Sequence, residues 1–159
     1  MSYKELREAL DGIDQGKQFD AFAFLAALST FTSLAPDEDQ LQLARELLIR
    51  VLDRETDFRP YAPIVQTLLR AVGLFPYLDA AGSDIATLIA TETHRPSAMP
   101  KDIVFTTKQA EVYRALMAGR NVVLSAPTSF GKSLIIDAVI ASGLHNNIVV
   151  VVPTLALVD

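Results

Sequence analysis

Two short valine-rich segments, separated by a loop and an apolar stretch, constrain the fold of the second half of the chain most strongly. Residues 121–125 and 148–152 are apolar and rich in valine, a pattern typical of strands buried on both faces of a parallel sheet. Residues 132–142 between them are apolar almost all round, as expected of a helix packed on a sheet. The order strand, loop, helix, strand predicts one βαβ unit.

The loop of this unit fits the phosphate-binding pattern GxxxxGK[ST] except at its first position, which is alanine. Its residues are Ala126, Pro127, Thr128, Ser129, Phe130, Gly131, Lys132 and Ser133. In such a loop, backbone N–H groups and the positive end of the following helix surround a polyphosphate. We expect the Lys132 ammonium to reach the outer phosphates and the Ser133 hydroxyl to coordinate magnesium. The alternative is a glycine turn with an incidental Lys-Ser pair, which the surrounding strand and helix pattern disfavours.

This loop resembles the first motif of superfamily 2 helicases of the DEAD/DEAH type. In that family the loop begins with alanine and often has threonine third, as Ala126 and Thr128 do here, whereas Ser129 stands where glycine is more usual. The resemblance implies a RecA-like domain that binds ATP and magnesium. It further implies a parent protein that hydrolyses ATP and moves on DNA or RNA, with Lys132 as its catalytic lysine.

A second motif of the same family follows the second valine-rich segment. The run IVVVVPTLALVD resembles an apolar strand that ends in Pro-Thr and opens a helix. In the family this turn contacts the nucleic-acid backbone, and the matching positions are Pro153, Thr154 and Leu155. Backbone N–H groups at a helix start suit a phosphate oxygen. Taken alone, Thr154 as a plain helix cap is an equally good interpretation.

A third motif lies upstream, where Gln109 stands at the position at which these helicases keep an adenine-reading glutamine. A glutamine amide can both donate to and accept from the adenine edge. Thr106 and Gln109 also have the spacing of a helix capping box, and the two roles are compatible. The resemblance covers residues 101–159. We expect a helix over residues 107–119 that Gly119 ends.

The first 91 residues have the periodicity of consecutive amphipathic helices. Prolines and Asp37 mark the starts of a third helix near Pro36 and a fourth between Pro60 and Pro63, and a short fifth is expected over residues 83–90. Phenylalanines at helical spacing are more often core than a partner-binding stripe. The expected core positions are Leu6, Leu10, Ile13, Phe24, Leu28, Phe31, Leu41, Ala44, Leu48, Val51, Leu52, Ile64, Leu68 and Val72.

Residues 92–101 interrupt these patterns, because they contain two prolines and no apolar period. We therefore expect an all-helical domain over residues 1–91, a linker over 92–101 and a partial RecA-like ATP-binding domain over 102–159. The fold class is thus α followed by the start of α/β. His94 and His145 stand alone in the linker and in a turn, which predicts solvated side chains and no metal site.

Composition excludes some classes of protein and leaves others open. The net charge of -5 comes from residues 1–95, which hold nine Lys and Arg against fifteen Asp and Glu, so no basic surface indicates nucleic-acid binding. The chain has no cysteine and no secretory signal, which makes the cytoplasm the default location. Its longest nearly uncharged stretch, residues 21–35, is shorter than the roughly 20 residues of a membrane span.

Hydrolysis in this family needs an Asp-Glu pair on a further strand to hold magnesium and orient water, and no such strand follows here. We therefore expect an expressed fragment, a proteolytic remnant or a truncated gene product that is inactive alone. Two other interpretations stay open. The chain could belong to another P-loop ATPase, or its helical domain could bind a partner protein while the nucleotide loop is inert.

Overall fold

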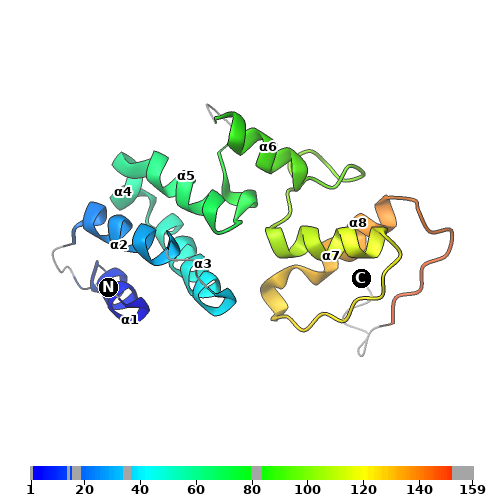
Figure 1. Cartoon of the computed structure of the whole chain (residues 1–159), viewed down its shortest axis with the longest axis horizontal. Coiled ribbons are helices and arrows are strands. Elements are labelled where there is room, and N and C mark those ends of the chain that lie inside the picture. Colours follow the sequence, from blue (N-terminus) through cyan, green and yellow to red (C-terminus); the bar gives the residue numbers. More distant parts are fainter. Residues whose placement is uncertain (1, 14, 16–18, 34–36, 80–83, 152–159) are drawn as a thin grey trace. The chain divides into compact units, whose positions relative to one another are not determined.

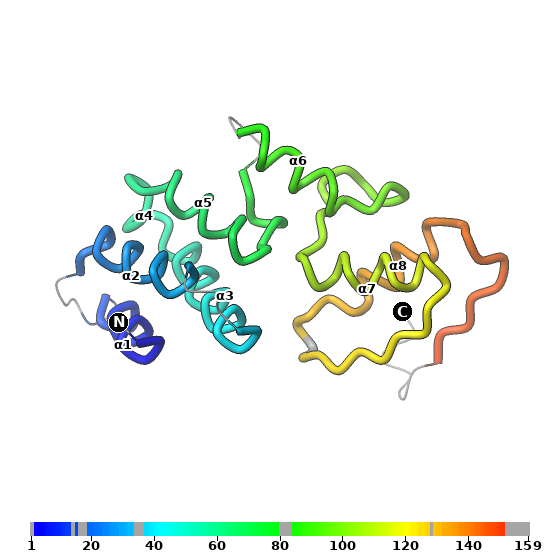
Figure 2. Tube along the Cα trace, viewed as in Figure 1, coloured from blue at the N-terminus to red at the C-terminus, as the bar shows by residue number. Residues whose placement is uncertain are grey.

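A computed structural model describes residues 2–13, 15, 19–33, 37–79 and 84–151, except for the side chain of Thr128. It divides the chain into two compact units, Met1–Thr93 and His94–Asp159. Figure 1 shows the helices of both units, and Figure 2 follows the chain through them. Among the described residues, none of the helices combines the length and apolar character of a membrane span.

The first unit is helical throughout its described part. Helices α1, α2, α3 and α5 pack on one another, and the short helices and turns α4, η1 and η2 join or extend them. Asp37 caps α3 in a capping box with Gln40, because each side chain accepts from the other residue's backbone N–H, at 2.8 and 3.2 Å. The elements are α1 (Tyr3–Ile13), α2 (Ala21–Ser33), α3 (Glu38–Leu52), α4 (Glu55–Phe58), η1 (Arg59–Tyr61), α5 (Ala62–Ala71), η2 (Phe75–Tyr77) and α6 (Ile85–Thr93).

The core of this unit contains every apolar position predicted to lie there. Ile13, Phe31, Leu41, Leu52 and Ile64 are partly buried at its margin, and the other predicted positions are buried. The rings of Phe19, Phe24 and Phe58 lie 5.6 to 5.8 Å apart within the core. The phenylalanines at helical spacing in α2 therefore serve packing, as predicted.

The last helix of the unit, α6, is held by polar contacts at its start. Asp84 accepts from the Thr87 backbone N–H at 2.8 Å and from Arg70 Nη1 at 2.9 and 3.0 Å. None of the described α6 residues is buried, and Ile85 is 76% exposed. The Thr87 hydroxyl, the Thr87 N–H and the Arg70 guanidinium lower the pKa of Asp84 from 3.8 to about 2.

The second unit is built on two helices, α7 (Thr107–Met117) and α8 (Lys132–Ala141), which pack on each other. Their small core consists of Phe105, Ala110 and Ala138 with partly buried neighbours. Gly119 follows α7 at φ +71°, as predicted for the residue that ends this helix. Helix α8 agrees with the predicted helix over residues 132–142 to within one residue.

The two predicted strands are not observed in the part of the chain that the structure describes. Residues 121–127 and 147–151 are neither helix nor strand, and Val152 lies outside the described residues. Val123, Val149 and Val151 are 101%, 86% and 89% exposed, so these segments do not have the two covered faces that the βαβ prediction requires. A strand forms only where a neighbouring strand supplies backbone partners, which the described residues do not provide here.

Candidate functional site

The loop over residues 126–133 leads through one short turn into helix α8. Residues Thr128–Phe130 form the turn η3, which the Phe130 N–H closes on the Pro127 carbonyl at 3.1 Å. Gly131 then takes the left-handed conformation, φ +81° and ψ +37°, and Lys132 begins α8. Glycine tolerates this conformation without the steric cost that other residues incur. The loop therefore ends at the start of α8, where the backbone N–H groups of the first turn have no partner within the helix.

A second restraint on Gly131 comes from the side chain beside it. A Cβ atom added at Gly131 would lie 2.6 Å from Nε2 of Gln109, closer than real Cβ atoms approach other heavy atoms. The backbone conformation favours glycine here, and a side chain at this position would have to displace the end of the Gln109 side chain. The close approach also shows that Gln109 and the loop share one site.

The ammonium group of Lys132 folds back over the start of its own loop. Nζ donates to the carbonyl oxygens of Ala126 and Pro127, both at 2.8 Å. Two of the three ammonium donors therefore bond to neutral acceptors of the loop. A phosphate oxygen is a stronger acceptor for an ammonium than a carbonyl, so an anion can replace these two partners.

The other loop side chains differ in exposure. Pro127, Ser129 and Ser133 are exposed, and Phe130 is half-buried. Ser133 is the second residue of α8, where its hydroxyl lies next to the unpaired N–H groups of the helix start. Among the described residues, no group of three or more acidic or histidine side chains could hold a metal ion alone. A magnesium ion at this loop would depend on the Ser133 hydroxyl, phosphate oxygens and water, which suits its chemistry.

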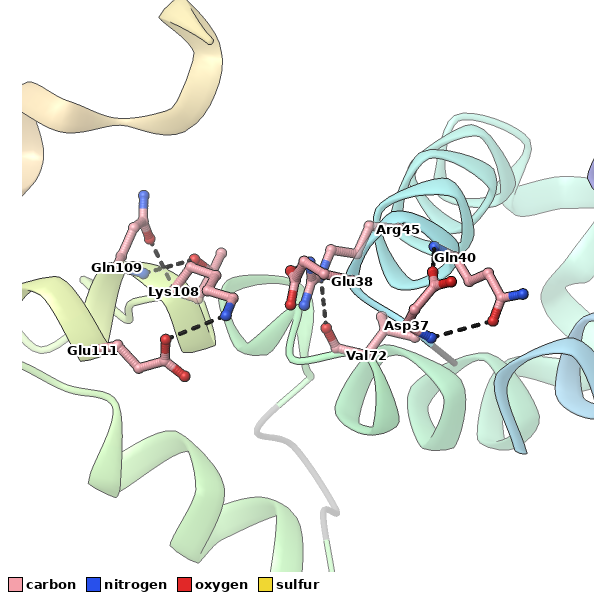
Figure 3. A network of polar contacts seen from close by, with 9 residues as sticks. Asp37, Glu38, Gln40, Arg45, Val72, Lys108, Gln109 and Glu111 are labelled. Carbon is pink, nitrogen blue, oxygen red and sulfur yellow. Dashed lines mark hydrogen bonds and ion pairs between the residues drawn. The ribbon is translucent and has the colours of Figure 1, made fainter. Parts of the chain in front are cut away.

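Gln109 is the one buried polar side chain among the described residues, with 8% of its surface exposed. Its Oε1 accepts from the Thr106 N–H at 2.9 Å, and the Thr106 hydroxyl accepts from the Gln109 N–H at 3.4 Å. Figure 3 shows this capping box at the start of α7, with the Lys108–Glu111 ion pair on the same helix. The predicted capping role is therefore confirmed. The Nε2 group makes a further bond that no sequence pattern indicated, to the Phe130 carbonyl at 2.8 Å.

Packing around Phe105 places Gln109 against the loop. Phe105 is buried, its ring meets that of Tyr113 edge to face at 5.4 Å, and its N–H donates to the His94 carbonyl at 2.9 Å. Ala110 of α7 and Ala138 of α8 belong to the same small core, and small residues let two helices approach closely. The predicted solvated role of His94 is thus wrong in part, because the residue is half-buried and tied to Phe105.

The predicted site residues are only partly brought together by the described structure. Gln109 bonds to the loop at Phe130, whereas Pro153, Thr154 and Leu155 lie outside the described residues. Sequence reasoning missed the anchoring of Lys132 on the loop carbonyls and that of Gln109 on Phe130. The Lys132 contacts depend on the local conformation of the loop, and the Gln109 contact depends on how α7 packs against α8, so neither follows from residue spacing.

Comparisons with known proteins match both units. Residues 1–90 match the family described as anti-bacteriophage protein B N-terminal domain, and residues 106–159 match DEAD/DEAH box helicase. The chain is 35% identical over 159 residues to anti-bacteriophage protein B of Escherichia coli (strain K12). That alignment covers 99% of this chain and 21% of the relative, so the chain spans about a fifth of the relative's length. No solved structure matches the chain.

Proposed function

Because the chain belongs to the anti-bacteriophage protein B N-terminal family and continues into a DEAD/DEAH box helicase match, we propose that its second unit binds ATP with magnesium. The protein of which it forms the N-terminal part is then an ATP-dependent helicase or translocase on DNA or RNA. The observation that supports this proposal best is the lysine at the helix start. Lys132 Nζ is bonded to the carbonyls of Ala126 and Pro127 in the loop, which phosphate oxygens can replace.

Each residue of the loop has a distinct proposed role. Lys132 neutralises charge on the outer phosphates, as the resemblance predicts for the catalytic lysine, and Ser133 provides a magnesium ligand. The backbone N–H groups of residues 128, 129 and 131–133 would surround the phosphates, while the Phe130 N–H closes the turn that Pro127, Thr128, Ser129 and Phe130 shape. The Gln109 amide can also contact adenine. Its bonds to Thr106 and Phe130 use one Oε1 lone pair and one Nε2 hydrogen, so a second of each remains for the base.

When bound, ATP with magnesium would supply a terminal phosphoryl group whose transfer to water is thermodynamically favourable. We propose that this chain binds the nucleotide and that cleavage requires an Asp-Glu pair elsewhere in the whole protein. Residues 102–159 would then begin a RecA-like domain, with residues 92–101 as linker and residues 1–91 as the helical domain. The strands predicted over residues 121–125 and 148–152 would form once neighbouring strands cover them.

The remaining proposals concern partners and cellular role. Pro153, Thr154 and Leu155 would contact the nucleic-acid backbone, in line with the helicase match to residues 106–159. The acidic helical domain is suited to a protein partner rather than to nucleic acid, because its charge is opposite to that needed for phosphates. The name of the relative suggests a role in defence against bacteriophage, which we propose for this protein in the cytoplasm.

Titration of the chain with magnesium-ATP tests the proposal. Lys132→Ala should weaken binding by about tenfold to a hundredfold, because a charge-assisted contact contributes roughly 1.5–3 kcal/mol. Lys101→Ala is the matched control, since Lys101 is exposed outside the loop and its loss changes the net charge equally. Absence of binding at millimolar ATP, with both units folded, would contradict the proposal and favour an interaction module. ATP turnover that Lys132→Ala abolishes would instead show that the chain hydrolyses ATP.

A further inference from the structure

We infer that Gln109 is a positioning residue of the phosphate loop, which sets the affinity for triphosphates whatever their base. The inference rests on the proposed nucleotide function and extends it. The resemblance assigns the Gln109 amide to adenine, whereas the structure shows this amide bonded to the loop itself, at the Phe130 carbonyl. A residue that fixes the conformation of the loop affects the affinity for every ligand that binds through its phosphates.

The orientation of the amide is fixed at both of its ends. Oε1 accepts from the Thr106 N–H at 2.9 Å, and Nε2 donates to the Phe130 carbonyl at 2.8 Å. If the amide turned over, an oxygen would face the Phe130 carbonyl and an NH₂ group would face the Thr106 N–H, so both contacts would become repulsive. With 8% of its surface exposed, the side chain has few other acceptors within reach. Gln109 therefore supplies one donor at a fixed place beside the loop.

That donor controls the peptide group that joins Phe130 to Gly131. In a planar trans peptide the carbonyl and the following N–H point in opposite directions. When Gln109 holds the Phe130 carbonyl, the Gly131 N–H consequently points away from Gln109. Gly131 is the N-cap of α8, so this N–H belongs to the group of donors at the helix start that the proposed phosphate site uses.

The loop is thus anchored by side chains at both of its ends. Lys132 holds the carbonyls of Ala126 and Pro127 at its start, and Gln109 holds that of Phe130 near its end. An incoming phosphate competes for the Lys132 ammonium but does not compete for the Gln109 donor, because Gln109 bonds to a carbonyl and not to the phosphate. The Gln109 contact can therefore persist when a triphosphate binds, and its loss weakens binding through the loop.

The substitution Gln109→Met removes this donor without adding a charge beside the loop. The Thr106 hydroxyl still caps the Gln109 backbone N–H, so α7 should still form. Gln40→Met is the matched control, because Gln40 has the same place in the capping box of α3 in the other unit and loses the same capping acceptor.

Three ligands separate loop positioning from base reading: magnesium-ATP, magnesium-GTP and magnesium-tripolyphosphate, the last of which has no base. We expect Gln109→Met to weaken magnesium-GTP and magnesium-tripolyphosphate by a similar factor, on the order of tenfold, and magnesium-ATP by at least that factor, with Gln40→Met leaving each within about twofold. In NMR spectra of the chain without nucleotide, the Gly131 amide signal should shift in Gln109→Met and not in Gln40→Met.

Three other results would each contradict one part of the proposals. If Gln109→Met weakens ATP alone and leaves tripolyphosphate binding intact, Gln109 reads the base and does not position the loop. An unchanged Gly131 signal in Gln109→Met would contradict the inference whether or not any ligand binds. If the unsubstituted chain binds none of the three ligands, the proposed nucleotide function fails instead, and the Gly131 signal alone decides the role of Gln109 in the loop.

Discussion

Gly131 combines a backbone requirement and a side-chain requirement in one residue. Its φ of +81° favours glycine, and the amide of Gln109 occupies the space that a Cβ atom would need. Gly119 has a similar φ of +71°, but nothing lies within 4 Å of the Cβ that it lacks. The two glycines therefore allow the cost of the left-handed conformation to be separated from the cost of the close contact.

Gly119→Ala should destabilise the second unit by about 1–2 kcal/mol, the cost of a left-handed conformation for a residue with a side chain. Gly131→Ala should cost more, because the added methyl group also displaces the Gln109 amide from Phe130. Hydrogen exchange of the α7 and α8 amides measures both effects. In the double variant Gly131→Ala with Gln109→Ala, the destabilisation beyond that of Gly119→Ala should become smaller. Equal costs for the two single glycine variants would show that Gln109 yields without penalty.

The sequence predicted the loop better than it predicted the contacts within the site. The eight loop residues are contiguous, and Thr106 and Gln109 lie one helical turn apart, so spacing alone indicates both features. The bond from Gln109 to Phe130 joins residues 21 positions apart. Its formation depends on α7 packing on α8 around Phe105, and no local pattern encodes that geometry.

At the scale of elements, helices were predictable and strands were not. A helix forms its backbone hydrogen bonds within one segment, so periodicity and caps such as Asp37 locate it. A strand depends on partners from other segments, and residues 121–125 and 148–151 lack them among the described residues. The short helix α4 and the turn η1 were also missed, because Glu55–Tyr61 is too brief to show a period.

Helix α6 gives a prediction about pH. The pKa of Asp84 is lowered to about 2 by its contacts with Thr87 and Arg70. The stabilisation of α6 by the ionised Asp84 is therefore complete above the ordinary pKa of 3.8 and is lost as the pH falls through about 2. Hydrogen exchange of the α6 amides should therefore show constant local protection above pH 3.8, after correction for intrinsic rates, and decreasing protection towards pH 2.

Two substitutions at Asp84 separate the cap from the ion pair. Asn is a good N-cap without a charge, so Asp84→Asn should keep most of the α6 protection and remove its pH dependence between 3.8 and 2. Asp84→Ala removes both contacts and should lower protection at every pH. A pH dependence that survives in Asp84→Asn would show that another group is responsible.

At the scale of the whole molecule, the two units differ greatly in the size of their cores. Fifteen buried apolar residues form the main core of the first unit, and three form that of the second, among the residues that the structure describes. Because stability at this size depends mainly on buried apolar area, the first unit should be much the more stable.

Denaturant unfolding followed at residues of each unit should therefore show two transitions, with the second unit unfolding first. Leu48→Ala should lower the free energy of unfolding of the first unit by about 2–5 kcal/mol, since Leu48 is fully buried. Leu88→Ala is the matched control, because Leu88 is exposed on α6, and it should change the free energy of unfolding of the first unit little. A single transition for both units, or equal effects of the two leucines, would contradict this assignment.

The exposed valines of the second unit favour aggregation of the protein in concentrated solution. Val123, Val149 and Val151 expose most of their surface, and residues 148–151 form an uncharged run with high β-propensity. Such a run is a template for intermolecular cross-β pairing. Neighbouring strands that cover these valines should therefore raise the solubility of the chain, and the net negative charge of the first unit opposes aggregation.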